Sequence, residues 1–293
     1  MRPTLLSLLL LFILGSCAFN KLFLAPYPLQ QADSFTRYVD RYEDSLTLTF
    51  TESKAPYITK SNGDAQLLPY HVESTFFPSE SGSILHGWLL KPKTNDSGKV
   101  LFFLHGNAGN VAYNYSLVTP FAEAGYQVFL FDYSGFGFSS GKSTRKNVLM
   151  DANSALDFLI ARLTPEQKLI IYGQSLGGHL SAVVAAQNPG KFNALVIEGA
   201  FSSHKDIANE QVALLGRMFT REMYSAEKSI PMVTAPVLII HSTEDQTIPY
   251  AHGAHLFEVA QTPKSLYTID KPHIRGPLYY LDSISARIDQ MLK

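Results

Sequence analysis

The sequence predicts an α/β fold in which a mostly parallel central sheet is flanked by helices. Short apolar runs alternate with stretches of helical periodicity, which is typical of parallel strands joined by helical crossovers. The run from Val100 to Leu104 is apolar throughout, as expected for a strand buried on both faces. The chain has 293 residues, of which 46% are hydrophobic, enough core material for one large domain.

The elements follow from these patterns in chain order. Pro165 and Pro189 end two of the helical stretches because proline cannot continue a helix. Strands are expected over residues 71–77, 84–90, 100–104, 127–131, 169–172, 194–197, 237–240 and 265–269. Helices are expected from the Gly-rich turn after Leu104 to about residue 124, and over residues 144–163, 176–189, 250–260 and 278–292.

The N-terminus has the pattern of an export signal. Arg2 provides a basic start, residues 5–14 form a short apolar run, and a small-residue site ends at Cys17. The pattern resembles a bacterial lipoprotein signal, which implies a mature chain that begins at Cys17 and is tethered to the membrane by lipid. A plain secretory signal is the alternative. With Ala18 after the cysteine, the resemblance implies the cell envelope, and the outer membrane in a Gram-negative bacterium.

Three segments are therefore expected. Residues 1–16 would be the signal peptide, residues 17–70 a tether with peripheral elements, and residues 71–293 the α/β domain. Within that domain, residues 201–235 are helical and irregular, and are the expected position of a small lid over the site.

Ser175 is the candidate nucleophile. It is the serine of a Gly-x-Ser-x-Gly pattern between an apolar strand and a small-residue helix. A sharp turn at this point lifts the hydroxyl out of the sheet, and Gly173 and Gly177 allow strand and helix to pass closely. A structural Gly/Ser turn is the alternative reading.

A second Gly-rich turn, residues 105–110, follows the strand that ends at Leu104. Acyl transfer places negative charge on a carbonyl oxygen, which fixed backbone N–H groups stabilise by about 2.7 to 4 kcal/mol each. The expected donors of this oxyanion hole are the N–H groups of Leu176 and Asn107.

The acid and the base are expected on loops after the last two strands. Asp245 follows the strand at 237–240, with Glu244 as the alternative acid, and His273 follows the strand at 265–269. Asp132 precedes the nucleophile in the chain, and a structural role for it is favoured.

The order nucleophile, acid, base resembles the α/β-hydrolase fold from about His71 to the C-terminus. The motifs HGNAGN, DYSGFG, GQSLGG and HSTEDQTIP resemble those of small-lid serine hydrolases. Ser242, where glycine is usual, and Lys271-Pro272 before His273 depart from that pattern. The resemblance implies a serine esterase or thioesterase that acts on a small-molecule or acylated substrate. A serine peptidase or amidase, and a non-catalytic surface-binding lipoprotein, are the alternatives.

The composition argues against several other classes of protein. A net charge of −1 gives no electrostatic basis for binding nucleic acid. The single cysteine, Cys17, excludes an intrachain disulfide and a thiolate metal cluster, and the nine histidines show no close ligand spacing. No cofactor and no catalytic metal are therefore expected.

Overall fold

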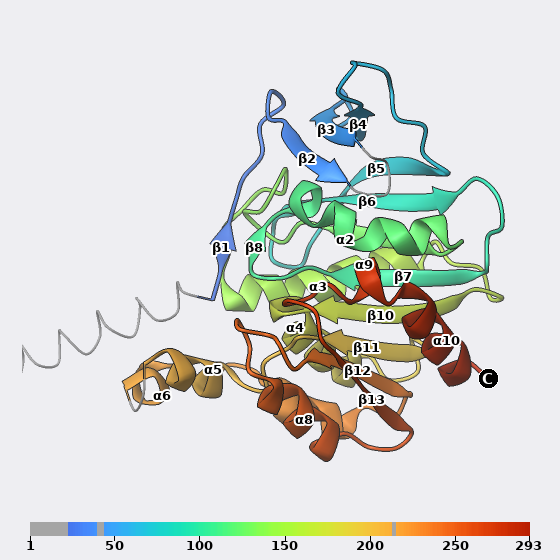
Figure 1. Cartoon of the computed structure of the whole chain (residues 1–293). Helices are drawn as coiled ribbons and strands as arrows, with labels where there is room; N and C mark the ends of the chain where they lie inside the picture. Colours follow the sequence, from blue (N-terminus) through green and yellow to red (C-terminus); the bar gives the residue numbers. More distant parts are fainter. Residues whose placement is uncertain (1–22, 40–43, 213–214) are drawn as a thin grey trace, which may run out of the picture.

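The computed structural model describes residues 23–39, 44–212 and 215–293. Eight strands form its central sheet, and they are β5 (Tyr70–Pro78), β6 (Ile84–Pro92), β7 (Lys99–Leu104), β9 (Gln127–Phe131), β10 (Lys168–Gln174), β11 (Ala194–Glu198), β12 (Val237–Ser242) and β13 (Lys264–Ile269). Their order is β13-β12-β11-β10-β7-β9-β6-β5 (Figure 1). The six strands from β13 to β9 run parallel, and β6 and β5 are added antiparallel at one edge.

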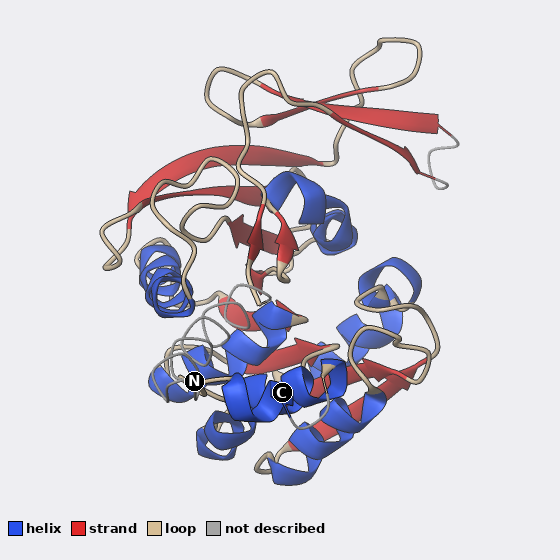
Figure 2. Ribbon diagram, turned by 90° about the vertical axis from the view of Figure 1, so that its left-hand side faces the viewer, coloured by secondary structure: helices blue, strands red, loops and turns tan. Residues whose placement is uncertain are grey.

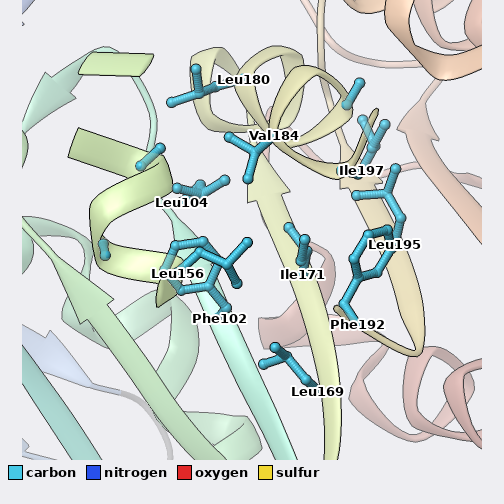
Figure 3. Close-up of a cluster of buried hydrophobic side chains, with 14 of the residues drawn as sticks. Phe102, Leu104, Leu156, Leu169, Ile171, Leu180, Val184, Phe192, Leu195 and Ile197 are labelled. Carbon is cyan, nitrogen blue, oxygen red and sulfur yellow. The ribbon is translucent and has the colours of Figure 1, made fainter. Parts of the chain in front are cut away.

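Helices cover both faces of this sheet. The face with α3 (Arg145–Ile160), α4 (Leu176–Gln187) and α8 (Tyr250–Val259) forms one hydrophobic cluster. The face with α2 (Val111–Glu123) and α10 (Leu281–Met291) forms another. Strand β10 contributes to both clusters because successive side chains of a strand point to opposite faces. Figure 3 shows Leu169 and Ile171 of this strand in the cluster that contains Leu180 and Val184 of α4. The predicted α/β architecture is confirmed.

The segment before the sheet also contains strands. A small antiparallel sheet is formed by β2 (Phe35–Val39), β3 (Asp44–Phe50) and β4 (Pro56–Thr59), and Figure 2 shows it outside the central sheet. Its buried side chains Phe50 and Ile58 belong to the cluster that contains Trp88 of β6. The two-residue strand β1 (Ala25–Pro26) pairs in parallel with β8 (Ala108–Gly109). The described residues of this segment therefore include paired strands that pack against the central sheet.

Two further stretches differ from the expected pattern in detail. The expected C-terminal helix is split into α9 (Gly276–Tyr279) and α10, because Tyr280 between them leaves the helical conformation at φ −130° and ψ 25°. The segment after β11 contains the short helices α5 (His204–Gln211), α6 (Leu215–Phe219), α7 (Ala226–Ser229) and the 3₁₀ turn η2 (Ile230–Met232). In the described part of the chain, no helix combines the length and apolar character needed to cross a bilayer.

Candidate active site

Ser175 lies at the sharp turn between β10 and α4. Its φ of 56° and ψ of −119° are unfavourable for a residue with a side chain, and such strain typically costs about 1 to 3 kcal/mol. The turn also needs its glycines. A Cβ on Gly173 would lie 2.2 Å from the carbonyl oxygen of Gly177, and a Cβ on Gly177 would lie 1.9 Å from that of Leu104. The Gly-x-Ser-x-Gly pattern is thus required by the close contact of β10, α4 and the end of β7.

The HGNAGN loop lies against Ser175, as the sequence predicts. A Cβ built on Gly106 would be 3.4 Å from the Cβ of Ser175, so the backbone next to Asn107 approaches the nucleophile closely. Leu176 is the first residue of α4, and N–H groups in the first turn of a helix have no partner within the helix. Both expected oxyanion donors therefore belong to segments that border Ser175.

Asp245 and His273 are brought together by the loops after β12 and β13. Nδ1 of His273 donates to Oδ2 of Asp245 at 2.6 Å. The other carboxylate oxygen accepts the backbone N–H groups of Thr247 and Ile248 at 2.8 and 2.9 Å. The alternative acid, Glu244, is exposed. The structure thus pairs the histidine with the predicted acid and not with its neighbour.

The surroundings of Asp245 favour its charged form. Burial raises the pKa of this carboxyl, but the hydrogen bond and positive charge of His273 and the two backbone N–H groups outweigh burial and hold the pKa below its ordinary value. Because Nδ1 of His273 carries the proton that Asp245 accepts, Nε2 is the nitrogen left as a base.

Ser175 and His273 meet at the end of β11. The N–H of Ser175 donates to the carbonyl of Glu198 at 2.9 Å, and a Cβ on the next residue, Gly199, would be 3.2 Å from the ring of His273. Within the described residues, the serine and histidine side chains form no hydrogen bond with each other. Such contacts often tighten only when substrate binds.

Glu198 is a residue of this site that the sequence analysis did not single out. Its carboxylate is buried and accepts three hydrogen bonds, from Tyr172 Oη at 2.7 Å, Gln174 Nε2 at 2.6 Å and the backbone N–H of Gly276 at 2.7 Å. Burial raises its pKa above the ordinary value, although these donors favour the charged form. Glu198 therefore connects the strand before Ser175 to the loop that carries His273.

The N-terminal segment also borders the site. Phe23 is 7% exposed and clusters with Leu176, Phe201 and Ile248. Two residues further on, the N–H of Ala25 donates to the side chain of Asn107. We call residues 23–29 the N-terminal strap, since they run from this apolar cluster, along the HGNAGN loop with which β1 pairs, to Leu29 in the cluster that contains Trp88.

Other predicted positions are placed as follows. Asp132 is buried, and its Oδ1 accepts the N–H of Val111 at the start of α2, a structural use of this carboxylate. The expected lid segment supplies Phe201 and Ile207 to the apolar cluster beside Leu176. Cys17 and the signal-like segment lie outside the described residues.

A groove elsewhere on the sheet is separate from these residues. It is lined by residues that include Val237 and Lys264, which begin β12 and β13, whereas Asp245 and His273 follow the ends of the same two strands. The groove thus lies at the amino ends of the strands, and the reactive side chains lie at the carboxyl ends, where open α/β sheets bind their ligands.

Comparison with known proteins identifies the family. Residues 99–229 match the family described as alpha/beta hydrolase fold. The uncharacterized protein YfhR of Escherichia coli O157:H7 is 34% identical over 214 residues, which cover 70% of this chain and 75% of that protein. The human alpha/beta hydrolase domain-containing protein 17B is 33% identical over 198 residues, covering 66% and 67% respectively.

Solved structures give the same fold. An esterase of Pyrococcus furiosus, Pf2001, superimposes with a TM-score of 0.62 at 17% identity, over 76% of this chain and 92% of that one. The match to the human alpha/beta hydrolase domain-containing protein 17B, together with the matching family region and the strand order of the central sheet, shows that the chain belongs to the alpha/beta hydrolase fold family.

Proposed function

We propose that this hydrolase cleaves carboxylic esters or thioesters through Ser175, His273 and Asp245. The observation that carries the proposal is the 2.6 Å hydrogen bond between Asp245 and His273, which meet at the same sheet edge as the strained Ser175. A serine on such a turn and an oriented imidazole are the two parts that nucleophilic acyl transfer needs.

The reaction follows from these groups. Nε2 of His273 takes the hydroxyl proton of Ser175 while Oγ attacks the substrate carbonyl carbon. The N–H groups of Leu176 and Asn107 stabilise the resulting oxyanion. As the C–O or C–S bond breaks, the leaving group receives the proton from His273. Water then repeats the sequence on the acyl-enzyme, releasing the carboxylic acid and restoring Ser175.

Labelling with a fluorophosphonate probe tests the nucleophile. The wild-type chain should be labelled and should hydrolyse p-nitrophenyl esters, and Ser175→Ala should lose both properties while remaining folded. Retained labelling of Ser175→Ala would show that another residue is the nucleophile. A panel of esters, thioesters and amides graded in acyl length defines the substrate class. Turnover of amides alone would replace the esterase proposal with an amidase.

We further propose that residues 201–235 act as a small lid. The lid segment contributes Phe201 and Ile207 to the cluster beside Leu176, which supports a role in shaping the acyl site. Substitution of Ile207 by Ala should change the preferred acyl length more than it changes the rate on acetate esters. An unaltered chain-length profile would contradict this role.

We also propose that the chain is exported and anchored in the bacterial cell envelope by lipid on Cys17. The apolar run and the small-residue site before this cysteine support the proposal. Mass spectrometry of the N-terminal peptide should find a mature chain that begins with a lipid-modified cysteine. Cys17→Ser should release the protein from the membrane fraction, and a wild-type chain that begins elsewhere would refute the anchor.

A further inference from the structure

A cluster of buried side chains beside the nucleophile helix contains polar atoms without hydrogen-bond partners. They are Nε2 of His179 in α4, Nε2 of His204 at the start of α5, and the hydroxyl of Tyr224. Their rings lie close together, with centroid distances of 4.6 Å between the two histidines and 5.3 Å from His204 to Tyr224. Buried polar atoms are normally paired, so the unpaired Nε2 of His179 and the unpaired hydroxyl of Tyr224 indicate a missing ligand.

His179 carries an unpaired lone pair within this cluster. Its Nδ1 is 3.0 Å from the carbonyl of Phe201 and therefore carries the proton, which leaves Nε2 as an acceptor. The side chain is fully buried, and an imidazole nitrogen with a lone pair is the donor that a metal ion requires. In metal sites, the ring nitrogen that does not bind the ion usually donates to a carbonyl or a carboxylate in this way.

His204 and Glu222 already have the spacing of two ligands on one ion. Nδ1 of His204 is 3.2 Å from Oε1 of Glu222. Two ligands bound tetrahedrally at zinc distances of 2.0 to 2.1 Å are about 3.3 Å apart. The other carboxylate oxygen is held by the backbone N–H of Lys205 at 3.1 Å, which fixes its orientation.

We propose that His179, His204 and Glu222 bind one divalent transition-metal ion, with zinc as the first candidate. One donor atom from each residue lies within 4.8 Å of the others. Two imidazoles and a carboxylate are a common zinc ligand set, and Tyr224, whose hydroxyl has no partner, contacts both histidine rings. The ion would replace the proton shared by His204 and Glu222.

The charges near these side chains determine the metal affinity that we expect. Glu222 supplies one negative charge, and the positive charge of Arg145 acts on both Glu222 and His204. Arg145 is held there by the carbonyl of Arg221 at 2.6 Å. Because the positive charge of Arg145 repels a metal ion, we expect weaker zinc binding here than in sites without a neighbouring arginine.

The position of the site gives the ion a structural role. His179 lies four residues after Ser175 on the nucleophile helix, whereas His204 and Glu222 belong to the lid segment. A shared ion would therefore join the nucleophile helix to the lid segment. The ion site follows from this cluster of donor atoms and is independent of the proposed reaction.

Metal binding can be measured on the full chain without a polyhistidine tag. After treatment with a chelator, equilibrium dialysis against Zn²⁺ should give one ion per chain, and Co²⁺ should give the visible absorption of a low-coordinate site. His179→Phe keeps the ring contact with Phe201 but loses the donor, and should weaken Zn²⁺ binding by at least about tenfold. Glu222→Gln should do the same.

Two variants serve as controls. His252 is also buried with an unpartnered Nε2, and His252→Phe should bind Zn²⁺ as the wild type does. Ser175→Ala should also bind normally, which separates this site from the catalytic proposal. Absence of stoichiometric Zn²⁺ in the wild type would overturn the site, and so would wild-type affinity in His179→Phe. If circular dichroism finds His179→Phe unfolded, the less buried Glu222→Gln decides the question.

Discussion

The backbone N–H of Ala25 donates to Oδ1 of Asn107 at 2.8 Å, across 82 residues of sequence. The same N–H lies 3.4 Å from the Asn107 carbonyl oxygen, and Tyr27 of the strap accepts a hydrogen bond from Asn110 at 3.0 Å. The N-terminal strap thus holds the loop expected to supply an oxyanion donor at two points, Asn107 and Asn110.

Removal of this one donor tests the connection. Ala25→Pro removes the N–H but keeps the extended backbone. Asn107 then loses a hydrogen bond worth about 1 kcal/mol that holds its side chain in position. We expect kcat for ester hydrolysis to fall about fivefold, with KM nearly unchanged. Ala25→Gly retains the N–H and should keep the wild-type kcat. Equal rates for the two variants would mean that the strap does not position the loop.

Glu198 is expected to act as a positioning residue. Glu198→Gln places an amide N–H₂ against a carboxylate site whose partners Gln174 and Gly276 are both donors, so at least one contact becomes repulsive. We expect kcat to fall about tenfold or more because Ser175 and the His273 loop lose their common support. Steady-state kinetics on a short ester measure the effect.

A second buried carboxylate provides the control for Glu198. Asp151 is also fully buried and accepts three hydrogen bonds, from Ser79, Ser81 and the N–H of Ser134. Asp151→Asn should destabilise the fold to a similar degree and leave kcat near the wild-type value. If both variants lower kcat equally, Glu198 contributes only to general stability.

The sequence was sufficient to predict the elements that depend on residues close together in the chain. Buried parallel strands are apolar runs, so β7 and β9 were predicted to within a residue. The pairing of Asp245 with His273 was also accessible, because loops after neighbouring parallel strands meet at one sheet edge.

Features that depend on partners far apart in the chain could not be predicted from the sequence. Strand β1 has two residues and exists only because the HGNAGN loop pairs with it. In the sequence, Glu198 is simply a polar residue at the end of a strand. Its role could not be predicted because its donors Tyr172 and Gly276 lie 26 and 78 residues away. The cluster of His179, His204 and Glu222 has no ligand spacing in the sequence for the same reason.

Stability should fall at acidic pH in part because of His105. Burial lowers the pKa of this imidazole, although the charge of Asp132 and the carbonyl of Gly106 oppose the shift. Below about pH 6.5 the unfolded chain binds a proton that the folded chain does not, so the free energy of unfolding drops by up to about 1.4 kcal/mol per pH unit. The loss continues until the pH reaches the lowered pKa of the folded state.

Urea unfolding at several pH values tests this contribution. His105→Asn keeps an N–H donor near the position of Nδ1 but cannot titrate, so its stability should decline less steeply between about pH 6.5 and 5. His71→Asn, at an exposed position, is the control and should follow the wild-type curve. Parallel curves for His105→Asn and the wild type would contradict the assignment.

The strain at Ser175 predicts a separation of activity from stability. With φ at 56° and ψ at −119°, the backbone occupies a region that glycine adopts readily and residues with a Cβ do not. Ser175→Gly should abolish hydrolysis yet raise the free energy of unfolding by about 1 kcal/mol. Ser175→Ala loses the same hydroxyl but keeps the Cβ, so it should be inactive without this gain. Denaturant unfolding of the three proteins measures the difference, and equal stability of the glycine and alanine variants would show that the turn stores no strain.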